Sequence, residues 1–153
     1  ALESMAAHIA TSEASDADLD ALRKFAMRNS VSATKAELGE YSDANIKFHQ
    51  MILELSGSDL LRSTAEGLLM HMHAVRRRAM GESDRASRSV ADHMEIIEAL
   101  EARDAELASR LVREHTMRLH DHIEDRWTRL RNLVQSKQRA EKAAAEKIKI
   151  KEK

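Results

Sequence analysis

The chain of 153 residues contains no cysteine and no proline, and only four glycines. Without cysteine, disulfides, thiolate nucleophiles and cysteine-based zinc sites are excluded, and histidines, carboxylates and amides remain as metal ligands. Aromatic residues make up 3% of the sequence, while alanine, leucine, glutamate, lysine and arginine are abundant. This composition favours helix along nearly the whole chain. We therefore predict an all-α fold.

Long apolar runs and a strong charge bias are also missing. No apolar run approaches the roughly 18 residues that a membrane-spanning helix needs, and no charged-then-apolar leader opens the chain. The formal net charge is −1, but residues 136–153 hold seven Lys/Arg and three Glu, so residues 1–135 carry about −5. A negatively charged body is not typical of a nucleic-acid-binding domain. We expect a cytoplasmic protein that does not bind membranes.

Capping residues and apolar spacing divide the chain into about six helices. Ser15 with the acids that follow it, Ser42 and Ser58 are suited to helix starts, and Gly57 is suited to a left-handed helix end. Further helices are expected over about 85–102 and from about 104 past 127. Short connections between long amphipathic helices predict an antiparallel bundle. We expect one domain over residues 1–135, followed by a charged tail rich in Lys, Ala and Glu over 136–153.

Three of the predicted helices place polar residues in an apolar stripe. In "DANIKFHQMILELSGS", Asn45 and His49 are four residues apart and share a face with apolar neighbours. His93 and His115 each occupy a core position in the stripe of a later helix. A single histidine on an apolar face is more often a satisfied core residue than a ligand. Burying several imidazoles and an amide without partners would cost about 1–3 kcal/mol each, however, and one shared cation satisfies them together.

Other residues are candidates for the same site. His122 is the substitute ligand if the last helix is rotated relative to this interpretation. Arg76 leans toward the core in "AVRRRAM" and is suited to binding a carboxylate. Asp43 and Asp92 fall on the wrong sides of their helices to join His49 and His93, so we expect them to be capping or solvated acids.

Two long stretches resemble a known family. "NIKFHQMILELSGSDLL" and "DHMEIIEALEARDAELASRLVREHTMRLHDHI" resemble the ligand-binding C-terminal domain, called the FCD domain, of the FadR subfamily of GntR transcriptional regulators. The opening "ALESMAAHIATSEASDADLDAL" is similar to the start of that domain. The resemblance covers residues 1 to about 132, and its most specific part is the set of three histidines, two of them 22 positions apart.

The resemblance implies that Asn45, His49, His93 and His115 bind a divalent metal such as zinc, nickel, cobalt or manganese. Asn45 stands where the family has Asp, and a neutral amide should hold the cation less tightly, so metal occupancy stays open. A small organic acid is expected to bind beside the metal, with Arg76 as its partner. The resemblance further implies a homodimer that binds DNA through an N-terminal winged helix-turn-helix domain, which is absent from this chain.

We expect no enzymatic activity. A metal-dependent, hydrolase-like helical bundle is an alternative, because three histidines with an open position can activate water. It lacks a general base, since Glu114 points away from the face of His115. A metal-free helical dimerisation module, in which the histidines are core residues, is the third interpretation.

Overall fold

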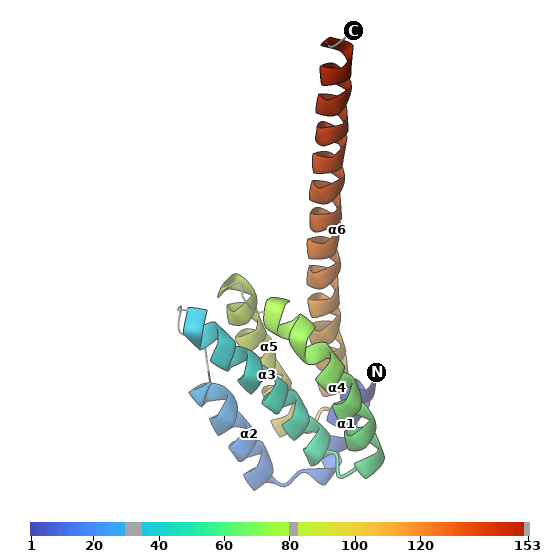
Figure 1. The fold of residues 1–153 in the computed structure, drawn as a ribbon. Coiled ribbons are helices and arrows are strands. Elements are labelled where there is room, and N and C mark those ends of the chain that lie inside the picture. Colours follow the sequence, from blue (N-terminus) through green and yellow to red (C-terminus); the bar gives the residue numbers. More distant parts are fainter. Residues whose placement is uncertain (30–34, 80–82, 152–153) are drawn as a thin grey trace. The chain divides into compact units, whose positions relative to one another are not determined.

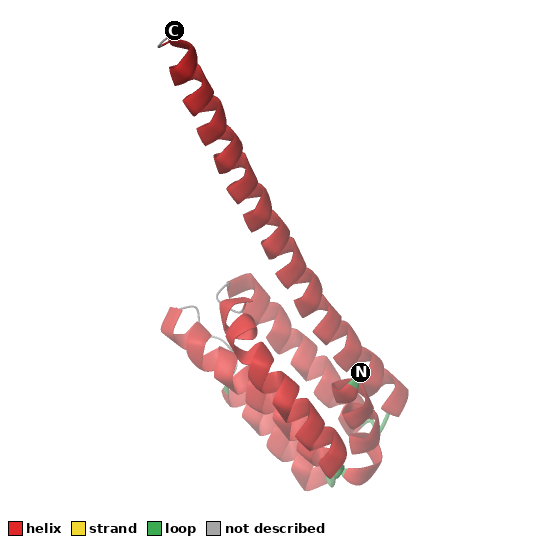
Figure 2. Ribbon diagram, turned by 45° about the vertical axis from the view of Figure 1, so that its right-hand side comes forward, coloured by secondary structure: helices red, strands yellow, loops and turns green. Residues whose placement is uncertain are grey.

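Helices make up most of the described part of the chain. The computed structural model describes the backbone of residues 1–29, 35–79 and 83–151, and the side chains of residues 1–29, 43–69 and 87–139. Within these ranges there are six helices and no strand (Figure 2). They are α1 (Leu2–Glu13), α2 (Asp16–Arg28), α3 (Lys35–Leu55), α4 (Asp59–Ala79), α5 (Ser83–Glu101) and α6 (Ala105–Lys151). The prediction of an all-α bundle of about six helices is confirmed.

The chain forms two compact units, residues 1–117 and residues 118–153. The first contains α1 to α5 and the beginning of α6, and the second contains the rest of α6. In the first unit α3 lies in the middle and contacts α1, α2, α4 and α5 (Figure 1). No helix in the described part of the chain combines the length and apolarity needed to cross a bilayer.

The core of the first unit is built around α3 and α5. Fully buried large side chains come from both helices, and α1 contributes small ones: Phe48, Ile52, Leu53, Ile96, Ile97 and Leu100, with Ala6, Ala7 and Ala10. Alanines with no exposed surface allow the backbone of α1 to approach its neighbours closely. This close approach brings the first turn of α1 near the centre of the bundle.

Two of the three predicted serine caps are found in the structure. Ser15 Oγ accepts a hydrogen bond of 3.2 Å from the Asp18 amide, and Asp18 Oδ2 accepts one of 3.0 Å from the Ser15 amide, which forms a capping box. Ser15 Oγ also donates a hydrogen bond of 2.6 Å to Asp18 Oδ2, and this bond together with that from the Ser15 amide lowers the pKa of Asp18. Ser58 caps α4 by accepting from the Leu61 amide at 3.3 Å.

The predicted cap at Ser42 is wrong. Ser42 lies inside α3, which already begins at Lys35. The sequence "KAELGEY" ahead of it consists mostly of good helix formers, and their propensity extends the helix toward the N-terminus. A serine that can cap a helix therefore does not have to mark its start.

A left-handed residue that is not glycine joins α5 to α6. Arg103 has a φ of 58°, a conformation that costs a residue with a side chain about 1–2 kcal/mol. Its guanidinium donates hydrogen bonds to the carbonyls of Thr11 (3.1 Å) and Ala14 (2.6 Å) and pairs with Asp16. These contacts between the α5–α6 turn and the α1–α2 connection offset the backbone strain.

The two glycines at residues 57 and 67 allow a matched test of the turn between α3 and α4. Gly57 has a φ of 64°, and no atom lies within 4 Å of a Cβ added there or at the helical Gly67. Gly57→Ala should lower the free energy of unfolding by about 1 kcal/mol, because the left-handed backbone is strained for alanine. Gly67→Ala should raise it by up to about 1 kcal/mol through helix propensity. Urea denaturation of both variants measures this, and shifts of the same sign would contradict it.

Candidate metal centre

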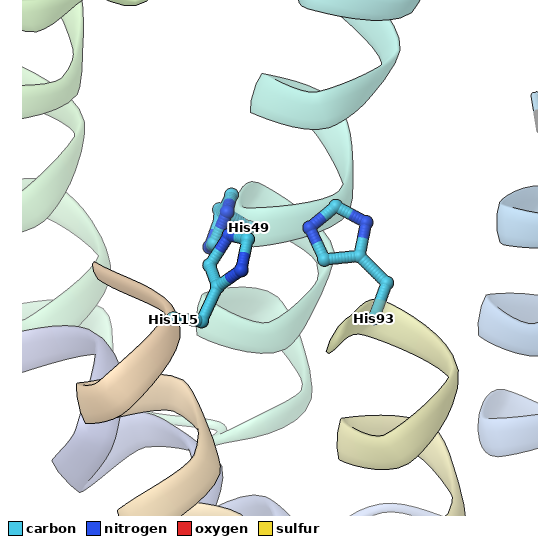
Figure 3. A group of neighbouring side chains, drawn as sticks. All are labelled: His49, His93 and His115. Carbon is cyan, nitrogen blue, oxygen red and sulfur yellow. The ribbon is translucent and has the colours of Figure 1, made fainter. Parts of the chain in front are cut away.

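Three buried histidines meet at the centre of the first unit. His49 on α3, His93 on α5 and His115 on α6 point toward one another (Figure 3). One possible ligand atom from each lies within 4.8 Å of those of the other two. Their exposed fractions are 1%, 4% and 0%. The structure thus brings together the three histidines that the apolar stripes placed on separate helices.

A buried aromatic ring packs against the cluster. Phe48, itself buried, stacks on His93 with a centroid distance of 3.9 Å and an interplanar angle of 16°. Neither ring nitrogen of His49 makes a hydrogen bond with the side chains and backbone that the structure describes. A buried polar atom without a hydrogen bond costs roughly 1–3 kcal/mol. A divalent cation at the centre would accept the nitrogen lone pairs, so the residues present fit such an ion.

Asn45 lies beside this histidine cluster, which we define as His49, His93 and His115. The amide is 2% exposed, and its Nδ2 donates to Ser89 Oγ at 3.1 Å. The same Nδ2 is 3.1 Å from Nε2 of His93. Because Nδ2 can only donate, His93 Nε2 accepts, and the ring proton of His93 lies on Nδ1. Asn45 therefore faces His93 with its amide nitrogen, while only its Oδ1 can bind a metal.

Two carboxylates lie near Nδ1 atoms of cluster histidines, and the periodicity of the sequence did not predict them. Asp92 Oδ2 is 2.8 Å from Nδ1 of His115, and its side chain is 15% exposed. Glu3 Oε2 is 3.4 Å from Nδ1 of His49, and its side chain is 12% exposed. Glu3 Oε2 also accepts a hydrogen bond of 3.3 Å from Thr116 Oγ1.

The prediction that Asp92 is a capping or solvated acid is wrong. Asp92 is indeed not directed at the face of His93, but the side of α5 that it occupies faces α6 and His115. The only signal was the adjacency in "DH": neighbouring residues of a helix point about 100° apart, so an acid next to the buried His93 faces a different neighbouring helix. For Glu3, in the first turn of α1, the sequence offered no comparable signal.

None of the other predicted residues belongs to the histidine cluster as the structure describes it. His122 belongs to the second unit, residues 118–153. The side chain of Arg76, the predicted effector ligand, lies outside the described residues. Asp43 is exposed, as predicted for a solvated acid.

Three neutral imidazoles can bind a borderline divalent metal such as zinc, nickel or cobalt. With three protein ligands, the coordination shell keeps an open position for a further oxygen ligand. A buried cluster of this kind can therefore hold a metal and present it to a small anion.

A family model matches most of the chain. The FCD domain family matches residues 1–118, which include all three histidines and both carboxylates. No curated protein is similar enough to the chain to count as a match. The matched residues make up most of the chain, and the resemblance seen in the sequence is confirmed. The chain belongs to the FCD domain family, the regulatory C-terminal domain of GntR/FadR-type transcription regulators.

Proposed function

We propose that this domain senses a small organic acid through a divalent metal held by His49, His93 and His115. The observation that carries the proposal is the burial of three imidazoles around one point, with both nitrogens of His49 lacking hydrogen bonds. In a domain without a cation these polar atoms are a net cost to stability. The cation would supply a Lewis-acidic centre on which a carboxylate can bind.

Asn45 is the proposed fourth ligand through its Oδ1 atom. The amide would have to turn over, because its Nδ2 now faces His93 Nε2. That nitrogen lone pair is also the one that a metal needs, so metal binding replaces the hydrogen bond from Asn45. A neutral amide in place of a carboxylate leaves the ligand set without negative charge, which favours an anionic effector over a neutral one.

The effector would act by shifting a conformational equilibrium. The histidines come from α3, α5 and α6, so a ligand on the metal contacts an arrangement of three helices. It can shift that arrangement by no more than its difference in affinity for the two states. In the full-length dimer this shift would alter DNA binding by a winged helix-turn-helix domain, and Arg76 would bind the effector carboxylate. A cytoplasmic location follows from this role.

Removing a single histidine from the cluster tests the metal site. The unmodified chain should bind about one zinc or nickel ion, and its melting temperature should rise with added metal, because a ligand of the native state stabilises it. His93→Ala and His115→Ala should each lose this binding. His120→Ala is the control, since His120 is exposed on α6. Titration calorimetry and thermal melts with and without chelator measure it; unchanged metal affinity in both cluster variants would contradict the site.

Replacing Asn45 by Asp should make metal binding tighter and the metal-free domain less stable. The carboxylate supplies a negative charge to the cation, but without metal it would be an acid 2% exposed beside His93. Zinc competition titration and melts in chelator report the two effects separately. Asn45→Ala shows whether Asn45 is a metal ligand or competes with the metal for Nε2 of His93. Metal binding weakens if Oδ1 coordinates the metal, and equal or tighter binding would show that Asn45 only forms a hydrogen bond with His93.

His49→Leu should stabilise the metal-free domain while abolishing the stabilisation by metal. Leucine fills a similar volume and removes two buried nitrogens that make no hydrogen bond. Glu3 keeps its hydrogen bond from Thr116 in this variant. Melts in chelator compare the variant with the parent chain. A melting temperature several degrees lower would mean that His49 contributes to stability without any metal, as expected of a metal-free dimerisation module.

A further inference from the structure

The ligands proposed for the cation carry no charge. Three neutral imidazoles and the amide of Asn45 leave a divalent ion with its full charge inside a bundle whose central side chains are hidden from water. An uncompensated buried charge is strongly unfavourable, and metal sites in proteins offset it with negative groups nearby. Before an effector binds, acids that do not touch the ion are the protein groups that can supply the compensating charge.

Asp92 is placed to provide one negative charge. Its Oδ2 lies 2.8 Å from Nδ1 of His115, a normal distance for a charge-assisted hydrogen bond. A ring that donates Nδ1–H to a carboxylate presents the lone pair of Nε2 on its other side. Asp92 comes from α5 and His115 from α6, so this contact also fixes the ring of one helix from another.

Glu3 is placed to provide the second. Its Oε2 lies 3.4 Å from Nδ1 of His49 and accepts from Thr116 Oγ1 at 3.3 Å. Thr116 directly follows His115, so one carboxylate oxygen contacts both His49 and the sequence neighbour of His115. The side chain is nearly buried, at 12% exposed, although a glutamate in the first turn of a helix is easily solvated. His93 faces the amide of Asn45.

We propose that Glu3 and Asp92 are positioning residues of the metal site: Asp92 orients the ring of His115 by a hydrogen bond to Nδ1, and Glu3 lies 3.4 Å from Nδ1 of His49. Together they supply the two negative charges that the neutral ligands lack. This rests on the proposed function, in which the cluster binds a divalent cation. An Asp at position 45 would supply negative charge directly at the ion. Here that charge lies instead on acids that contact the histidine ligands. With Glu3 and Asp92 ionised, the site and its cation are neutral together.

The test removes each charge and keeps the shape of the side chain. In the 153-residue chain, Glu3→Gln and Asp92→Asn should each weaken zinc binding 10- to 100-fold, the usual effect of a partner behind a metal ligand. Glu95→Gln, an exposed acid on α5, is the matched control and should leave zinc affinity unchanged. Competition with a chromogenic chelator measures these affinities. The visible spectrum of the cobalt-loaded variants should match the parent at saturation, because the histidines still bind, whereas that of His93→Ala should not.

A second measurement separates charge from general structural support. Each variant leaves the metal centre one unit more positive, so acetate added to the cobalt-loaded protein should bind more tightly than it does to the parent chain. Loss of packing alone would not tighten the binding of an anion. Melts in chelator show that the variants fold, and if one of them fails to fold, the other decides.

Two results would overturn the proposal on a chain that binds metal. One is unchanged zinc affinity in a folded variant, and the other is weaker zinc binding with no gain in acetate affinity. If the unmodified chain binds neither zinc, nickel nor cobalt, the proposed function itself fails and this inference fails with it. That outcome is distinguishable because it appears before any carboxylate is changed.

Discussion

The burial of three imidazoles at one point is the constraint on which the rest of the first unit depends. An imidazole in an apolar core needs a partner for each nitrogen, and the three rings come from α3, α5 and α6. The register of these helices is fixed by that meeting, since a shift of one residue would rotate a histidine by about 100° away from the others. The stacking of Phe48 on His93 and the close-packed alanines of α1 both serve to close this centre to water.

The three histidines of the cluster differ in their polar contacts. His115 has a carboxylate at hydrogen-bond distance, His49 has one somewhat farther away, and His93 accepts from an amide. An acid at position 45 would put the negative charge directly on a bound cation and would be costly to bury without one. Glu3 and Asp92 keep some exposure to solvent, and they already contact Nδ1 of a histidine or Thr116. The metal-free domain therefore tolerates these two acids better than an acid at position 45. On the proposed function, the present arrangement would exchange some metal affinity for stability of the metal-free domain.

Periodicity in the sequence predicted more of the site than of its surroundings. The stripes placed His49, His93 and His115 on inward faces because position along a single helix decides which face a residue occupies. They did not predict the contact of Asp92 with His115, because the reach of a side chain from one helix to the next depends on how the two helices are rotated. Arg103 was missed for another reason: the left-handed position usually takes glycine, and here three contacts to the α1–α2 connection replace that preference. Ser42 failed as a cap because the propensity of the preceding residues extends α3 past it.

The placement of Glu3 suggests how the state of the metal would reach the rest of a regulator. On the proposed function, the cation is held by α3, α5 and α6, while its compensating charge lies partly on α1. A carboxylate effector that binds the cation adds negative charge to the site, which weakens the attraction between the cation and Glu3. The contact that is already longest, 3.4 Å from Glu3 to His49, is the one that such a change would loosen first. The helix α1 is the nearest in sequence to the proposed DNA-binding domain. A change in the attraction between Glu3 and the cation would therefore connect effector binding to the position of that domain.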